Sequence, residues 1–194
     1  MVNEMKSKTD AIVGIGMMTA VIIVLQAFAL SIRVGIFSIT LVLAPIIVGT
    51  ALYGYLAGAY LGLVFGVVVL LTDAGAFLAV NVPGTIITCL LKGILAGLIS
   101  GIVFKALEPK GTTLASIAAG IVAPVVNTGV FLIGCRIFFF DTIAGWAEAA
   151  GAKSAGVFML TSFVGVNFIV ELVVNLVLST AIVRIIKIAK RNSN

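Results

Sequence analysis

The sequence contains no histidine and only two cysteines in 194 residues. Histidine is the usual general base near neutral pH and the commonest metal ligand. Cys89 and Cys135 both lie in apolar segments, and no spacing in the chain matches a metal or redox motif. We therefore predict that the protein holds no metal ion and needs no cofactor.

Charged residues are also scarce, at 10% of the chain. The aspartates Asp10, Asp73 and Asp141 lie far apart, so they do not form the metal-binding cluster of a phosphatidyl-alcohol transferase. The absence of histidine excludes an intramembrane serine protease of rhomboid type. Because no nucleophile, base and orienting group come together, the sequence predicts that the protein is not an enzyme.

Hydrophobic residues, by contrast, make up 62% of the chain, and the mean hydropathy is +1.32. Apolar runs near or above 18 residues recur, which indicates an all-α, polytopic membrane protein. The first run is too long for a signal peptide and lacks a clean cleavage site. We predict one integral membrane domain over residues 1–194, with short tails at 1–10 and 189–194. Its six transmembrane helices are expected at 11–32, 39–52, 56–71, 85–107, 114–140 and 157–188.

The net charge of +5 comes from basic residues that gather in the predicted inner segments. These residues are Lys6, Lys8, Lys105, Lys110, Arg184, Lys187, Lys190 and Arg191. The outer segments carry only Arg33, Arg136 and Lys153. The positive-inside rule then predicts that both termini are cytoplasmic. Since the basic residues are explained by orientation, we expect no nucleic-acid partner.

Small residues recur four apart in several predicted helices, which favours close helix packing. The third and fourth helices carry the steps Gly58, Gly62, Gly66 and Gly93, Gly97, Gly101. We interpret these as packing within the bundle. Gly16 and Ala20 make the same step in the first helix, where the pattern fits internal packing and partner docking equally well.

Polar residues inside the last predicted helix suggest a ligand-facing interior. Asn167, Glu171 and Asn175 lie four apart, on one helix face. A carboxylate at membrane depth costs roughly 3 kcal/mol or more, so it needs a polar interior or a partner. Asn127 follows Pro124 in the fifth helix and is expected to face Asn167. Interhelical hydrogen bonding that only holds the bundle together is the alternative for the asparagines.

Three further residues are candidates for ligand binding near the outer side. Lys92 is expected about 10 Å below the outer end of the fourth helix, at 1.5 Å per residue. Arg136 lies near the outer end of the fifth helix, where it can meet an anionic group or extend to the interface. Trp146, in the loop 141–154, is expected to cover the site as part of a lid.

The chain resembles the substrate-binding S components of energy-coupling factor (ECF) vitamin transporters. The resemblance covers essentially the whole chain. It rests on the six-helix plan, the Gly16–Ala20 step, the Lys-Gly of TCLLKGILAGLISGIVFK and the segments SITLVLAPIIVGTALYGYLAGAYLGLVFGVVVLL and PVVNTGVFLIGCRIFFFDT. It implies a multi-pass protein of the bacterial cytoplasmic membrane that binds a small vitamin-like substrate near the outer side.

The resemblance also implies partners. S components dock on a transmembrane coupling subunit that carries two ATP-binding cassette ATPases, and membrane lipid surrounds them. Gly16 and Ala20 occupy the position of the docking step, although the usual pair is two alanines. Pantothenate, riboflavin and queuine-type ligands all stay open as substrates. The alternative function is a small stand-alone secondary transporter that uses Glu171 for ion coupling.

Overall fold

The computed structural model describes residues 2–29, 33–34, 37–38 and 41–192. The side chains of residues 2–7, 33–34 and 37–38, and of twelve residues of the last helix, Asn167 among them, lie outside this description. The elements in chain order are α1 (Val2–Ala29), β1 (Arg33–Val34), β2 (Phe37–Ser38), α2 (Leu43–Tyr53), α3 (Tyr55–Thr72), α4 (Gly75–Leu78), α5 (Val82–Leu107), η1 (Glu108–Lys110), α6 (Thr112–Phe138), α7 (Phe140–Ala149), α8 (Ala155–Phe158), η2 (Met159–Val164) and α9 (Gly165–Asn192).

The described chain is almost entirely helical, which confirms the predicted all-α class. The two strands form a short antiparallel ladder in which Arg33 pairs with Ser38. Five stretches are long and apolar enough to cross a membrane: Lys8–Ala29, Tyr55–Thr72, Val82–Lys110, Thr112–Phe138 and Ala155–Leu178. Several apolar spans within one chain make the protein a multi-pass membrane protein.

The predicted second helix is shorter than the sequence suggested. It begins at Leu43 and has 11 residues, which give about 16 Å of helix against a hydrocarbon core of about 30 Å. Its residues are nearly all buried, so α2 is an interior helix of the bundle. The segment between the predicted third and fourth helices contains α4, and the predicted loop 141–154 contains most of α7.

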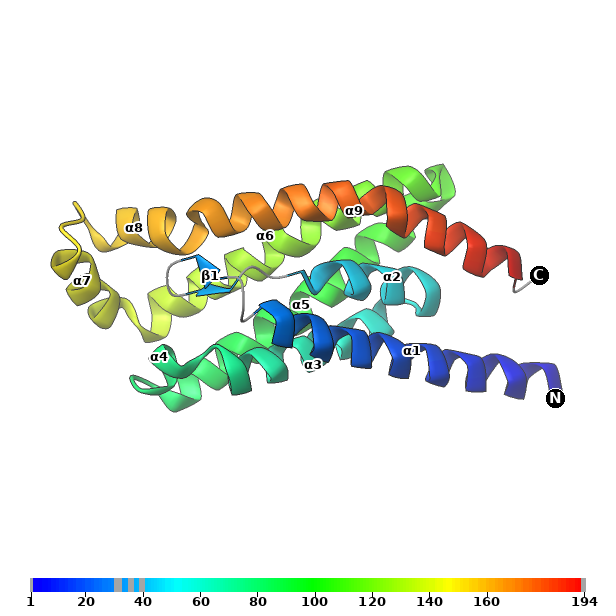
Figure 1. Cartoon of the computed structure of the whole chain (residues 1–194), viewed down its shortest axis with the longest axis horizontal. Helices are drawn as coiled ribbons and strands as arrows, with labels where there is room; N and C mark the ends of the chain where they lie inside the picture. Colours follow the sequence, from blue (N-terminus) through cyan, green and yellow to red (C-terminus); the bar gives the residue numbers. More distant parts are fainter. Residues whose placement is uncertain (1, 30–32, 35–36, 39–40, 193–194) are drawn as a thin grey trace.

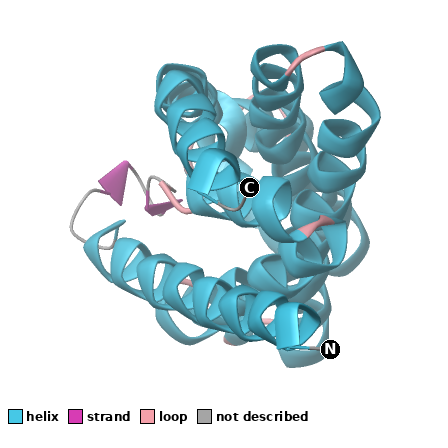
Figure 2. Cartoon of the chain, turned by 90° about the vertical axis from the view of Figure 1, so that its right-hand side faces the viewer, coloured by secondary structure: helices cyan, strands magenta, loops and turns pink. Residues whose placement is uncertain are grey.

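Both ends of the chain lie at one end of the bundle. In Figure 1 the start of α1 and the end of α9 lie together on the right, while α4 and α7 lie on the left. Figure 2, seen from the end that carries the termini, shows the two strands at the side of an otherwise helical bundle. We call the end with α4 and α7 the distal end and the other the terminal end.

Helices α3 and α5 pack with their backbones in contact. A Cβ at Gly62 would overlap the carbonyl group of Gly93, and a Cβ at Gly97 would overlap that of Gly58. The glycine steps of these two helices therefore face each other. This confirms the interpretation that they serve packing inside the bundle.

The distal end of α5 is fixed by a cap that its sequence encodes. Asn81 Oδ1 accepts a hydrogen bond from the backbone N–H of Gly84 at 2.9 Å, and Pro83 occupies the first turn. Asparagine at the N-cap and proline just inside the helix are the preferred residues there. The cap sets where α5 begins and therefore where Lys92 lies along it.

Candidate ligand-binding site

An aromatic cluster fills the distal end of the bundle beneath α4 and α7. It is centred on Phe77 of α4, whose ring packs edge-to-face on four others. The centroid distances are 5.7 Å to Phe131, 5.0 Å to Phe139, 5.8 Å to Trp146 and 6.2 Å to Phe163. Edge-to-face pairs add about 0.5–1.5 kcal/mol each beyond the area they bury. We call these five residues the Phe77 cluster.

A cation lies at the inner edge of this cluster. The Nζ atom of Lys92, in α5, is 5.4 Å from the ring centroid of Phe131 and 5.5 Å from that of Phe65 in α3. Cation–π attraction of this kind is worth about 0.5–2 kcal/mol, the more so where water is excluded. The neighbouring Gly93 packs on Gly62, so the Lys-Gly pair combines one packing residue with one charged residue.

An unpaired acceptor lies one helical turn further in. Asn127 precedes Phe131 by four residues and so lies on the same face of α6. The residue is 6% exposed, and its Oδ1 atom has no hydrogen-bond partner among the described residues. A buried acceptor without a donor costs about 1–3 kcal/mol. Asn127 is therefore the kind of group that a donor on a ligand would satisfy.

The polar residues spaced four apart in α9, Glu171 and Asn175 among them, lie in different environments. Glu171 is 6% exposed and Asn175 is 1% exposed. The Asn175 side-chain amide donates to the backbone carbonyl of Glu171 at 2.8 Å, within its own helix. Its backbone lies against Gly120 of α6. Asn175 is thus satisfied by its own helix, and the predicted pairing of Asn127 with Asn167 concerns a side chain outside the described residues.

Arg136 does not lie beside Asn127. Nine residues separate the two, which is two and a half turns of helix, so they lie on opposite faces of α6. Arg136 is exposed, and its guanidinium lies 4.0 Å from the ring centroid of Phe140. It lines an open surface hollow of about 310 Å³ with Asp141 and the neighbouring backbone of the α6–α7 junction.

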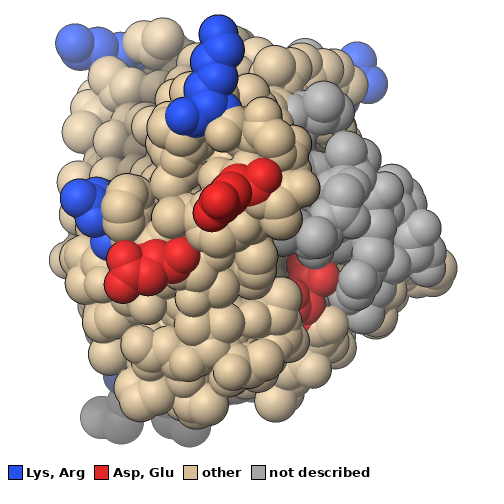
Figure 3. All heavy atoms as spheres, turned by 90° about the vertical axis from the view of Figure 1, so that its left-hand side faces the viewer, with Lys and Arg blue, Asp and Glu red and all other residues tan. Residues whose placement is uncertain are grey.

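Charged groups are sparse on the distal surface itself. Figure 3 looks onto this end and shows acidic side chains among uncharged atoms, with basic groups towards the upper and left edges. Asp141 and Glu148 are both exposed there. An anionic ligand would therefore meet its cation inside the bundle, at Lys92, rather than on this surface.

The predicted docking residues face away from the bundle. Gly16 and Ala20 are exposed on α1, and nothing lies within 4 Å of a Cβ placed at Gly16. Gly14 is buried instead, against the Tyr53 side chain. The exposed step therefore leaves a small-residue surface open to the membrane, while Gly14 serves internal packing.

Sequence reasoning missed the rings that build the site. Phe77, Phe131 and Phe163 come from three different elements, and nothing in their spacing brings them together. Phe139 belongs to a run of three phenylalanines, Phe138–Phe140, and is the one that is 3% exposed and packs on Phe77. The π-helical turn η2, which carries Phe163, is a second feature without a sequence signal. π-Helical turns are rare in proteins, and those that occur often lie at functional sites.

The fold is that of a helical membrane protein, with a buried, partly polar cluster at its distal end. The family model described as "ECF transporter, substrate-specific component" matches residues 10–183. The chain belongs to this family, so it is a substrate-specific subunit of a transporter in the cytoplasmic membrane and not an enzyme.

One curated relative extends the comparison. The chain is 27% identical over 207 residues to the "Pantothenic acid transporter PanT" of Lactococcus lactis subsp. cremoris (strain MG1363). The match covers 97% of this chain and 99% of that protein. No solved structure matches the chain significantly.

Proposed function

We propose that the protein binds pantothenate and delivers it to an ECF-type importer. Family membership supports a vitamin-like substrate, and the relative named for pantothenic acid favours this one. The observation that carries the proposal is the position of Lys92. The Lys92 ammonium lies near the rings of Phe65 and Phe131, and Phe131 lies one helical turn from Asn127, whose oxygen is unpaired among the described residues.

The groups of pantothenate match this arrangement one by one. Its carboxylate would pair with Lys92, and its hydroxyl or amide hydrogen would be donated to Asn127 Oδ1. Its dimethyl carbon would pack on the rings of the Phe77 cluster. Glu171 would close the inner side, and Trp146 of α7 would cover the outer side. Arg136 is left out of the proposed site because it lies on the opposite face of α6.

The ligand would enter by separating the rings around Phe77. The cluster joins residues of α4, α6, α7 and η2, so a shift of α4 and α7 opens it from the distal end. This entry route predicts that ligand binding quenches or shifts the fluorescence of Trp146, the single tryptophan in the chain.

Titration calorimetry with pantothenate and pantothenol tests the proposal. Pantothenol replaces the carboxylate with an alcohol and keeps the rest of the molecule. An ion pair with Lys92 predicts that pantothenol binds at least tenfold more weakly, and that Lys92→Gln removes most of this difference. Tighter binding of riboflavin than of pantothenate, or an unchanged ratio in Lys92→Gln, would exclude the proposed ligand or the proposed pairing.

We further propose that both termini are cytoplasmic and that α1 docks on a coupling subunit served by two ABC ATPases. The basic residues of the terminal end and the exposed step Gly16–Ala20 support this. With α2 entering the bundle, the chain would then pass between the two membrane faces six times. A cysteine placed at Ser193 should react with an impermeant reagent only after the cells are broken.

A further inference from the structure

A cavity at the terminal end of the bundle is separate from the proposed vitamin site. It has a volume of about 320 Å³ and lies where the α2–α3 turn meets the last turns of α5. Its lining includes Thr50, Tyr53, Tyr55, Lys105 and Glu108. Nothing in the transport of a vitamin through the Phe77 cluster uses these residues.

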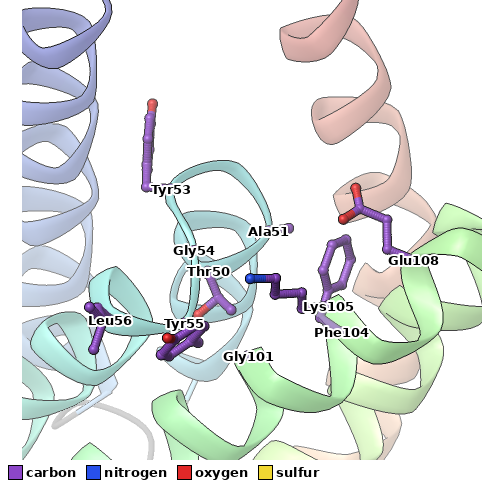
Figure 4. Close-up of a pocket in the computed structure, with 10 residues that line it drawn as sticks. All are labelled: Thr50, Ala51, Tyr53, Gly54, Tyr55, Leu56, Gly101, Phe104, Lys105 and Glu108. Carbon is purple, nitrogen blue, oxygen red and sulfur yellow. The ribbon is translucent and has the colours of Figure 1, made fainter.

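The polar groups of this cavity converge from two sides. Figure 4 shows Lys105 extending from α5 towards the α2–α3 turn, with Thr50 and Tyr55 close together beyond it. Lys105 Nζ lies 5.5 Å from the ring centroid of Tyr55. Thr50 is 3% exposed, and its hydroxyl is closed off from the cavity because the oxygen lies against Gly58 of α3. The cavity therefore offers one cation, Lys105, whose ammonium can donate hydrogen bonds to a phosphate group.

The surroundings of the cavity are those of a membrane interface. Lys105 lies in the last turn of α5, and the two tyrosines at the α2–α3 turn are typical of the headgroup level. Leu56, which also lines the cavity, is 70% exposed on the lipid-facing side of α3. A polar recess beside an exposed apolar surface suits a molecule with a charged head and a hydrocarbon tail.

We propose that this cavity binds the phosphoglycerol headgroup of an anionic phospholipid, with its acyl chains along α3. The phosphate lies at Lys105, and the glycerol hydroxyls donate to the carboxylate of Glu108. Other basic residues of the same end, Arg184 among them, favour a headgroup with net negative charge. Phosphoethanolamine, which is zwitterionic, does not meet that requirement.

Native mass spectrometry of the full chain from nanodiscs tests this assignment. The discs contain equal amounts of phosphatidylglycerol, phosphatidylethanolamine and phosphatidylcholine with identical acyl chains. The wild type should retain phosphatidylglycerol selectively, and Lys105→Gln should lower its retention by roughly fivefold. The matched control is Lys110→Gln, an exposed lysine that does not line the cavity and should change nothing. Unaltered melting temperatures of both variants in detergent would show that they fold.

The outcomes separate the alternatives. Equal retention of the three lipids, preferential retention of phosphatidylethanolamine, or equal losses in the two lysine variants would overturn the proposal. Inorganic phosphate added in detergent distinguishes the source of the anion. Suppose that millimolar phosphate raises the melting temperature of the wild type as much as phosphatidylglycerol does, and does not raise that of Lys105→Gln. The site then takes free phosphate, and the lipid assignment is overturned.

Discussion

Two asparagines of similar burial show how a polar residue at membrane depth reveals its role. The Asn175 side-chain amide donates a hydrogen bond to a carbonyl of its own helix, which offsets the free-energy cost of burying it. Asn127 has an oxygen that no described residue satisfies. The sequence treats the two alike, as single polar residues in apolar helices. Only the packing of the helices shows that Asn175 is satisfied within its own helix while the Asn127 oxygen is left unpaired among the described residues.

Replacing Asn127 with leucine should move stability and binding in opposite directions. Removal of an unsatisfied acceptor should stabilise the empty protein by about 1–3 kcal/mol. Loss of the proposed donor partner should weaken pantothenate binding roughly tenfold or more. Thermal unfolding in detergent and titration calorimetry measure the two effects.

Asn175→Leu is the matched control for this prediction. It should lower stability, because a satisfied hydrogen bond is lost, and leave affinity nearly unchanged. If Asn127→Leu destabilises the empty protein while affinity stays the same, Asn127 is a structural residue of the bundle.

At the scale of elements, α1 is attached more loosely to the bundle than α3 and α5. Only 17% of its apolar span is buried, close to the 19% of the C-terminal span, against 39% for α3 and α5. Residues such as Ile12, Met17 and Phe28 are more than 60% exposed. A helix that presents small residues between exposed apolar ones has a surface that a further helix can cover closely.

Ala20→Trp should block docking of this surface on a coupling subunit. The exposed position leaves room for the indole in the isolated protein, so melting temperature and ligand affinity should stay close to those of the wild type. Co-purification with a coupling subunit should be lost because the helices can no longer approach closely. A variant that still forms the complex would place the docking surface elsewhere on the molecule.

Gly62→Ala should be far more damaging than Gly16→Ala. The added methyl group at Gly62 meets the backbone of Gly93, which has no side chain to move aside. Overpacking of this kind costs about 1–3 kcal/mol or more. The methyl group at Gly16 meets nothing and improves helix propensity. Thermal unfolding of both variants should show a large drop for the first and none for the second.

The sequence predicted the helical class and the packing helices well, and the reason is that long apolar runs and glycine steps are local signals. The sequence overestimated the length of α2, because an apolar run has the same composition whether its helix crosses a membrane or ends inside the bundle. It missed α7 because a short amphipathic helix between two spans resembles a loop. The Phe77 cluster was beyond reach, since its members meet only after four elements have packed.

At the scale of the whole molecule, the proposed vitamin site and the chain termini lie at opposite ends of the bundle. Figure 1 shows α4 and α7 at one end and both termini at the other. This separation is compatible with the proposed function, in which the substrate is captured at one end and the coupling subunit is met elsewhere.

The protein alone in liposomes should therefore bind without accumulating its ligand. Radiolabelled pantothenate should reach the stoichiometry of the protein and no more, with or without a proton or sodium gradient. Accumulation driven by either gradient would favour the stand-alone secondary transporter, in which the buried Glu171 couples the ion. A Glu171→Gln variant would then abolish the gradient response.

The contact between α3 and α5 has a consequence for how the gene can vary. Every single-base change in a glycine codon that alters the residue introduces an atom at Cβ or ends translation. At Gly62, Gly93 and Gly97 that atom would meet only the backbone of the opposite helix, so no nearby side chain can shrink to make room. Compensation would need a matching displacement of a whole helix. The proposed site consists of separate aromatic and polar side chains, so single substitutions can change substrate preference gradually. The α3–α5 contact tolerates almost no single substitution.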